Sequence, residues 1–297
     1  MLTAVERRKR RVAIAIPSSL VSDTPHLREK TVRVGLLARA AAIFRIDKLL
    51  IYDQNPPVDR EKREFLKKIL LYLETPQYLR KRMFSLSPEM RYVGVLPPLR
   101  TPHHPLETSS QVESTVYREA LVLHSDRNSM TVDVGQAEPV RVKGRSLQAG
   151  SRVTLKIERV AEGERFSVVS REDVPFYWGY EVCLSGKTLG ETVRRRHSEL
   201  IIMTSKYGRP ILEELPILRK RLKMASKVMV VFGSPREGVR EILKRDGLKP
   251  EDLSDLVLNT IPLQGTETVR TEEAVYATLA ILNVVEAEGN TEHQGQP

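Results

Sequence analysis

Two neighbouring strand-to-helix transitions between residues 227 and 282 constrain the fold of this chain most strongly. The first follows residues 228–232, an apolar, largely β-branched run with the length of a buried strand, and leads through Gly233 into a helical pattern. The second follows the short apolar run 256–258 and leads through an irregular loop into a helix near Thr271. In open α/β sheets such loops lie at the carboxyl ends of the strands, where ligands bind.

The two loops indicate a ligand by their chemistry. Gly233 and Gly265 allow backbone to come close to a bound molecule. Ile261, Pro262 and Leu263 predict a flat apolar wall beside exposed amides, which suits an adenine ring better than a triphosphate. No Gly-Lys-Ser/Thr follows Gly233, which argues against a phosphate loop and a nucleotide hydrolase. From the spacing alone, two ordinary strand-to-helix turns remain the alternative.

Both loops resemble motifs of the SPOUT (SpoU–TrmD) RNA methyltransferases, whose trefoil-knotted α/β domain binds S-adenosylmethionine. The second motif of the family is similar to residues 232–238, and the third is similar to residues 261–265. The Ser and Asn that follow in many SpoU members correspond to Val269 and Thr271, and Pro235 replaces an acidic residue. The resemblance therefore implies a cofactor site more strongly than a particular catalytic chemistry. It is closest to a branch with a small β-barrel inserted into the knotted domain.

The resemblance implies S-adenosylmethionine as the cofactor and places its contacts in three loops. Besides the two loops above, the segment after the apolar strand at residues 200–203 borders the cofactor in the family. The implied cofactor-binding residues are Thr204, Gly208, Phe232, Gly233, Ser234, Glu237, Gly238, Asn259, Ile261, Pro262, Gln264 and Gly265.

A strand, a helix and a strand follow one another between residues 12 and 52, which predicts a βαβ unit with parallel pairing. Gly35, Arg39 and Phe44 on this helix are similar to the SpoU pattern whose arginine points toward the acceptor nucleotide. Arg39 is thus the candidate for positioning the substrate during catalysis, and an ordinary exposed or ion-paired arginine is the alternative. The apolar positions on one side of the helix are Val32, Leu36, Ala40 and Ile43.

Alternating apolar and polar residues between Tyr117 and Ser170 predict five short strands separated by glycines. An OB-like barrel is the simplest fold for such a series. Because Tyr117 and Phe166 are the obvious aromatic residues here, we expect electrostatic docking of RNA, and a purely structural insert is the alternative. The predicted RNA-binding residues are Arg141, Lys143, Arg145, Arg152 and Lys156.

The net charge of +10 favours a polyanionic partner such as RNA, although basic proteins without one are common. A basic arm at residues 6–11 either touches RNA or is a solvated terminus. Cys183 is the single cysteine, and His103 and His104 have no acidic or thiol partner at a useful spacing. We therefore expect no metal site, and backbone or RNA contacts for the histidines. No apolar run reaches the ~18 residues that span a bilayer and no secretory signal is visible, so a cytoplasmic location is expected.

The predicted fold class is α/β, with a knotted methyltransferase domain at residues 1–92 and 175–287 and an inserted OB-like barrel at 93–174. Residues 288–297 are expected to form a flexible tail. The knot and a homodimer that builds the substrate site across its interface follow from the resemblance alone. The expected function is methylation of ribosomal or transfer RNA by S-adenosylmethionine. A non-catalytic RNA-binding or ribosome-assembly factor is the alternative, which the missing SpoU Ser and Asn favour and the intact cofactor loops oppose.

Overall fold

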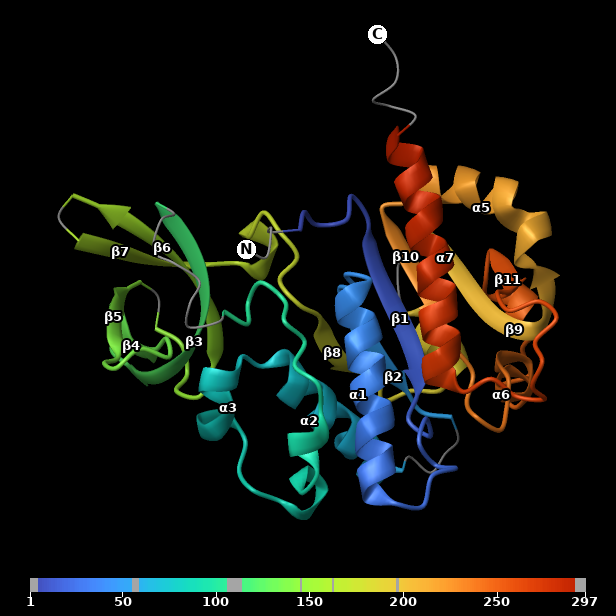
Figure 1. The fold of residues 1–297 in the computed structure, drawn as a ribbon, viewed down its shortest axis with the longest axis horizontal. Helices are drawn as coiled ribbons and strands as arrows, with labels where there is room; N and C mark the ends of the chain where they lie inside the picture. The colour runs from blue at the N-terminus through green and yellow to red at the C-terminus, as the bar shows by residue number, and fades with distance from the viewer. Residues whose placement is uncertain are drawn as a thin grey trace, which may run out of the picture. The chain divides into compact units, whose positions relative to one another are not determined.

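A computed structural model describes residues 5–54, 59–105, 114–144, 146–161, 163–195 and 198–291. The chain divides into two compact units, each with its own sheet (Figure 1). The barrel unit comprises Met1–Arg7, Tyr72–Pro88 and Pro98–Gly179, and the α/β unit comprises Arg8–Leu71, Glu89–Pro97 and Tyr180–Pro297. The barrel unit thus includes residues that precede the range 93–174 expected from the sequence.

The α/β unit is built on a six-stranded sheet in the order β11-β9-β10-β1-β2-β8. Every neighbouring pair is parallel, which confirms the pairing predicted for the first βαβ unit. The strands are β1 (Arg11–Pro17), β2 (Lys48–Tyr52), β8 (Glu181–Leu184), β9 (Leu200–Pro210), β10 (Lys227–Val231) and β11 (Leu256–Asn259).

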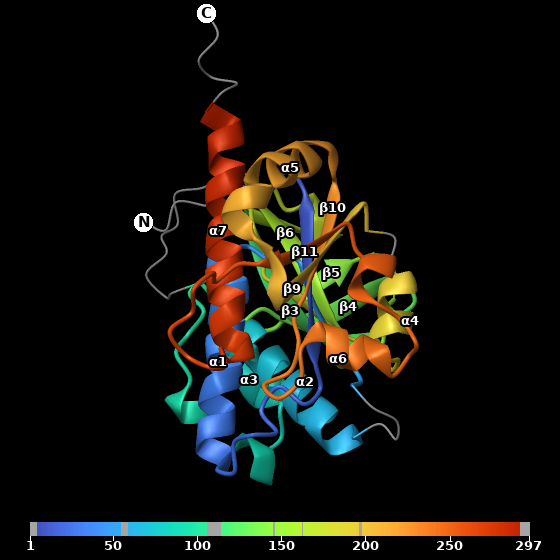
Figure 2. The same ribbon diagram turned by 90° about the vertical axis from the view of Figure 1, so that its right-hand side faces the viewer.

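Helices cover both faces of the sheet, so the central strands bury apolar side chains on both of their sides. Met229 and Val231 of β10 pack with α4 (Leu189–Arg194) and α6 (Val239–Lys244) on one face. Val228 and Val230, which alternate with them, are also buried. Helices α1 (Leu27–Ile43) and α7 (Thr271–Thr291) pack on each other along the opposite face (Figure 2). Helix α5 (Ile211–Met224) contacts α7 and β9.

Helix α1 forms where the sequence predicts it, but the apolar row read from the sequence is mostly not its buried side. Val34 and Leu37 are fully buried, whereas Val32, Leu36 and Ile43 are 38%, 41% and 49% exposed. These three residues, called the α1 face here, leave an apolar strip on the surface of the unit. Helix α7 also runs further than expected, because it continues to Thr291 into the range predicted as a flexible tail.

The basic arm folds back onto helix α7 instead of extending into solvent. Nη1 of Arg8 and Nη1 of Arg10 lie 3.1 and 2.8 Å from the carboxylate of Glu286. Only 2% of the Arg8 side chain is exposed, and burial lowers its pKa while Glu286 acts in the opposite direction. Free solvation, one of the two expectations for this arm, does not describe these two arginines, and contact of the arm with RNA stays a prediction.

The barrel unit contains an antiparallel sheet in the order β5-β4-β3-β6-β7, which confirms the five predicted strands. The outer strands β5 and β7 approach each other, so the sheet is nearly closed and barrel-like. Alternate apolar residues such as Val132, Val142 and Leu155 fill its interior. The strands are β3 (Thr115–Ser125), β4 (Ser129–Asp133), β5 (Val140–Lys143), β6 (Arg152–Val160) and β7 (Gly163–Val169).

The remaining helices are short or lie near the limits of the two units. They are α2 (Arg60–Glu74), α3 (Gln77–Met83) and the 3-10 helices Pro88–Met90, Val93–Val95, Arg171–Asp173 and Pro250–Asp252. None of the helices in the described part of the chain combines the length and the apolar character needed to span a membrane.

Four charged side chains form a cluster within the barrel unit, called the ionic cluster here: Glu74, Glu119, Arg152 and Arg171. Arg152 lies 2.6 Å from each carboxylate, and Arg171 also pairs with Glu74. Nε1 of Trp178 donates to Glu119 at 2.5 Å. Burial alone would raise the pKa of Glu74, but Arg171 and Arg152 hold it well below its usual value. The opposite charges of these neighbours make the buried carboxylates tolerable.

The two histidines of the proline-rich segment contact backbone, as one of the expectations for them states. Nε2 of His103 and Nε2 of His104 donate to the carbonyl oxygen of Glu74 at 2.8 and 2.9 Å. Both rings are buried. Burial, helped by the nearby His103, lowers the pKa of His104 to about 3. His104 is therefore neutral at physiological pH.

Candidate functional site

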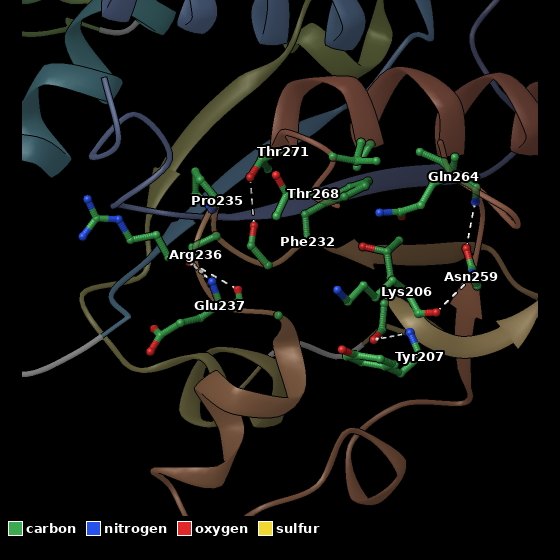
Figure 3. A pocket seen from close by; sticks show the side chains of 18 of the residues that line it. Lys206, Tyr207, Phe232, Pro235, Arg236, Glu237, Asn259, Gln264, Thr268 and Thr271 are labelled. Atoms are coloured by element: carbon green, nitrogen blue, oxygen red, sulfur yellow. Dashed lines mark hydrogen bonds between the residues drawn. The ribbon is translucent and has the colours of Figure 1, made fainter. Parts of the chain in front are cut away.

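The middle of β9, the carboxyl ends of β10 and β11 and the start of α7 line a pocket of about 310 Å³ (Figure 3). Its position agrees with the general rule for ligands of open α/β sheets. The predicted cofactor residues that line it are Thr204, Phe232, Gly233, Ser234, Glu237, Gly238, Asn259, Ile261 and Gln264. The predicted residues Gly208, Pro262 and Gly265 are not among its lining residues. The contacts of all these residues with a cofactor stay a prediction.

The loop after β10 forms one wall and is tightly folded. The amide of Ser234 donates to the carbonyl of Glu237 at 2.8 Å, and the amide of Glu237 donates to Oγ of Ser234 at 3.0 Å. A Cβ on Gly233 would lie 2.8 Å from the Glu237 carbonyl oxygen and 3.0 Å from Cα of Gly238. Only glycine therefore fits at position 233 without moving backbone.

Two hydroxyl groups outside the predicted cofactor-binding set hold this loop in place. Oγ1 of Thr271 donates to the carbonyl of Gly233 at 3.0 Å, and the hydroxyl of Tyr52 donates to the carbonyl of Phe232 at 2.8 Å. Burial raises the pKa of Tyr52, so its hydroxyl keeps the proton that it donates. Tyr52 ends a predicted strand of the same parallel sheet, and that position is the signal that points to it.

Two amide side chains, Asn259 at the end of β11 and Gln264, fix the conformation of the loop that follows β11. Nδ2 of Asn259 donates to the carbonyl of Lys206 at 3.0 Å, and its Oδ1 accepts from the amide of Ile261 at 3.0 Å. Nε2 of Gln264 donates to the carbonyl of Thr266 at 2.8 Å. Both residues line the pocket, yet these bonds also bind them to backbone. Their first effect is to fix the conformation of the loop.

The apolar wall expected from Ile261, Pro262 and Leu263 is only partly present. Ile261 lines the pocket, whereas Leu263 is fully exposed and has a φ of +57°. The prediction that Leu263 belongs to the wall is wrong, because its backbone conformation turns the side chain into solvent. A left-handed leucine is strained, and such strain is found most often near functional loops.

The third wall comes from an excursion within β9. Strand β11 pairs its consecutive residues Val257 and Leu258 with Met203 and Arg209 of β9, so residues 204–208 leave the ladder. Residues 204–207 line the pocket. A Cβ on Gly208 would lie 2.7 Å from the carbonyl carbon of Leu258. Gly208, predicted as a cofactor contact, therefore lets β11 approach β9 at the end of the excursion.

Charged side chains of both signs line the pocket. The carboxylate of Glu237 pairs with Arg245 and accepts a hydrogen bond from Gln54, whose Nε2 also lies 3.2 Å from Oγ of Ser234. Gln54 lies two residues after the end of β2, so it too comes from the carboxyl edge of the sheet. The charged lining residues are Lys206, Arg236, Glu237, Glu241 and Glu267.

Arg39 lies on α1 and is not among the residues that line the pocket of its own chain. It is half-buried, close to Tyr276 of α7. Burial raises the pKa of Tyr276, and the charge of Arg39 acts in the opposite direction. Gly35, one turn earlier, has a packing role, because its Cβ would lie 2.5 Å from Cδ2 of Leu96.

The predicted RNA-binding residues of the barrel unit have different surroundings. Arg141 is 73% exposed and lies 3.5 Å from Asp126, and Lys143 is also exposed. Lys156 pairs with Glu158 at the surface. Arg152 is part of the ionic cluster with 15% of its side chain exposed, so it has no free charge for phosphate. Arg145 lies outside the described residues.

Comparison with known proteins places this chain among nucleic-acid-modifying enzymes. The model of a family described as "Putative RNA methyltransferase" matches residues 11–282. An uncharacterized protein of Haloarcula marismortui is 32% identical over 92% of this chain and 99% of its own length. The 28S rRNA (uridine-N(3))-methyltransferases of Homo sapiens and Drosophila melanogaster are each 31% identical over 91% of this chain, and the match covers 77% and 61% of their lengths.

Proposed function

The chain belongs to this family of RNA methyltransferases, and on that premise we propose that it transfers a methyl group from S-adenosylmethionine to N3 of a uridine in large-subunit ribosomal RNA. The pocket between β9, β10 and β11 carries the proposal, because its walls are the loops that resemble the SPOUT cofactor motifs. The named relatives at 31% identity supply the acceptor atom and the class of RNA.

The residues of the pocket fit such a cofactor. Its volume of about 310 Å³ lies within the range of small-molecule sites. Phe232 and Ile261 offer apolar surface to an adenine, and Glu237, Glu241 and Glu267 offer negative charge to a cationic sulfonium. Bound there, the cofactor supplies an electrophilic methyl group with an excellent leaving group. As N3 takes the methyl group its own proton must leave, to water or to a nearby base, so the protein needs chiefly to align the acceptor nitrogen and to give that proton a path out.

The proposal extends to the finer features of the fold. Strand β11 follows β10 in the chain but lies beyond β9 in the sheet, an order consistent with the trefoil knot of SPOUT enzymes. The nearly closed sheet of five strands is consistent with an OB-like barrel inserted into a methyltransferase domain at residues 1–92 and 175–287. Knot, insertion and these limits remain part of the proposal.

A homodimer completes the proposed substrate site. The α1 face exposes Val32, Leu36 and Ile43, and such apolar strips mark interfaces. Arg39 lies on the same helix, so a second copy packed on α1 would bring Arg39 to the pocket of its partner, as the family resemblance implies. Leu36→Asp should then yield a monomer in analytical ultracentrifugation that still binds cofactor but no longer methylates RNA. A monomeric wild type would contradict this part of the proposal.

RNA is the proposed partner of the exposed cations of the barrel unit. Arg141 and Lys143 lie on its surface, and Lys156 is half-exposed beside Glu158. Family membership favours the enzyme over the alternative of a non-catalytic RNA-binding factor. The cytoplasmic location stays a prediction.

Two measurements test the proposed function. Calorimetry should show binding of S-adenosylmethionine that ATP does not displace. Mass spectrometry of large-subunit rRNA from a strain without the gene should show the loss of an N3-methyluridine, which purified protein and cofactor restore. Binding of ATP without any response to S-adenosylmethionine would overturn the assignment.

Arg39 variants separate a catalytic from a structural role. Arg39→Ala should keep cofactor binding and lower methyl transfer by about a hundredfold or more, since a misplacement near 1 Å has that effect. Arg39→Lys should restore little, because an ammonium lacks the planar fork of a guanidinium. Equal activity of Arg39→Ala and wild type would remove Arg39 from the site.

A further inference from the structure

The aromatic ring of Tyr207 lies exposed at the rim of the pocket. It is 68% exposed, and within the described ranges every other Phe, Tyr and Trp side chain is buried or half-buried. Figure 3 shows it on the side of the pocket opposite the start of α7. Aromatic rings gain free energy from burial, so an exposed one beside a pocket indicates a ligand that covers it.

The backbone that carries Tyr207 is anchored although its ring is largely exposed. The excursion at residues 204–208 is held at one end by Oγ1 of Thr204, which donates to the carbonyl of Val231 at 3.0 Å. Asn259 holds the carbonyl of Lys206, and the amide of Tyr207 donates to Oγ of Ser205 at 3.2 Å. A ring on a fixed backbone loses little entropy when it binds, which favours recognition over accidental exposure.

The charge beside the ring indicates which ligand covers it. Nζ of Lys206 lies 5.1 Å from the centroid of the Tyr207 ring. The cofactor proposed above carries a net positive charge, a sulfonium and an ammonium against one carboxylate, so a lysine is a less favourable neighbour for it than for a polyanion. A nucleotide of RNA offers both a base to stack on the ring and a phosphate for the ammonium. The pair therefore matches the methyl acceptor better than the methyl donor.

We propose that Tyr207 is the platform on which the target uracil stacks, with Lys206 contacting a neighbouring phosphate. This inference rests on the proposed function and names the residues that position its substrate. N3 of uridine lies on the Watson–Crick edge, so the base must leave any pair or stack before it reacts. Stacking on Tyr207 binds the face of the uracil and leaves that edge free to point into the pocket. Tyr207 is thus a positioning residue of the acceptor site.

Three variants test the stacking. Tyr207→Ala should lower kcat/KM for methylation of rRNA from the deletion strain by about tenfold to a hundredfold, the usual effect of losing one base stack. Tyr207→Phe should stay close to wild type, because it keeps the ring. Leu212→Ala is the matched control, since Leu212 is 72% exposed on α5 and does not line the pocket. The cofactor Kd, measured by calorimetry, should be unchanged in all three.

A photo-crosslink tests the contact without relying on turnover. A short single-stranded oligoribonucleotide with one 4-thiouridine should form an adduct that mass spectrometry maps to Tyr207 or Lys206. Adducts found only elsewhere would overturn the inference.

The outcomes separate this inference from the proposed function. If Tyr207→Ala methylates as well as wild type, the stacking is wrong and the proposed function stands. If Tyr207→Ala loses cofactor affinity, the ring serves the cofactor and the inference is again wrong. If wild type neither binds S-adenosylmethionine nor methylates, the proposed function fails, and the crosslink alone decides whether Tyr207 contacts a base.

Discussion

The ionic cluster of the barrel unit and the pocket rim of the α/β unit use charge in opposite ways. In the cluster, Arg152 lies 2.6 Å from both Glu74 and Glu119, and the carboxylates are 2% and 1% exposed. At the rim, Lys206 is exposed beside an exposed tyrosine. A basic residue in a sequence therefore does not indicate a nucleic-acid contact by itself. What decides is whether the fold brings an acidic partner to it.

The strongest test of this contrast removes an acid from the cluster. Glu74→Ala should lower the free energy of unfolding by about 3–5 kcal/mol, because it leaves buried arginine charge without its partner. Urea unfolding followed by fluorescence of Trp178, the single tryptophan, reports on this unit directly. Glu158→Ala, which breaks the surface pair with Lys156, is the control and should leave the midpoint unchanged. If the free energy of unfolding falls no more for Glu74→Ala than for the control, water replaces the carboxylate as the partner of the arginines.

In the loops around the pocket, glycines rather than charges are the sensitive points. Gly233→Ala should weaken cofactor binding roughly tenfold or more, because its Cβ would press on backbone atoms that cannot yield cheaply. Gly265 is different, since a Cβ there meets no atom within 4 Å. Gly265→Val should keep the unfolding midpoint, so that a weaker cofactor affinity measured by calorimetry reports direct contact with the ligand. Unchanged affinity for Gly265→Val would place the adenine elsewhere.

The stability of the barrel unit should also depend on pH, through the buried His104 beside the ionic cluster. His104 has a folded-state pKa of about 3, below its unfolded value, so below about pH 6.5 the unfolded chain binds a proton that the folded chain does not. Stability should therefore fall as pH falls, by up to about 1.4 kcal/mol per pH unit. Urea unfolding at pH 7, 6 and 5 measures this slope.

A matched pair of histidine variants isolates this effect. His104→Gln should flatten the pH dependence, while His124→Gln should not, because the His124 side chain is 73% exposed. The same slope in His104→Gln and wild type would rule out His104 as the cause.

Substitutions on the outer surface of the barrel unit should have the smallest effect of these variants. Replacing Arg141 and Lys143 by Glu should weaken RNA binding and make its salt dependence shallower, by about 0.7 in the log–log slope for each lost contact with single-stranded RNA. Fluorescence anisotropy with labelled rRNA fragments at several salt concentrations gives the slope. Since both side chains are exposed, the folded structure should be unaffected. An unchanged slope would make the barrel a structural insert.

Local pattern was sufficient for much of this molecule. The apolar runs predicted β1, β2, β9, β10 and β11, and alternation predicted the five strands of the barrel unit, because side-chain period follows directly from backbone geometry. The motif at residues 232–238 led to the pocket because Gly233 is required by contacts only a few residues away. Such features can be predicted from the sequence because the residues that impose a conformation and the residues that adopt it lie within one short stretch of chain.

The sequence by itself thus determined the parallel sheet, the strands of the second sheet and the loops of the pocket. Only the tertiary structure decided which side of α1 is buried, that Leu263 turns outward, and that Arg152 pairs with Glu74, 78 residues away. It also decided that the excursion in β9 leaves Tyr207 exposed. The physical reason is that exposure and charge pairing depend on which distant segments of the chain pack together. The residues next to a given position in the sequence do not determine that packing.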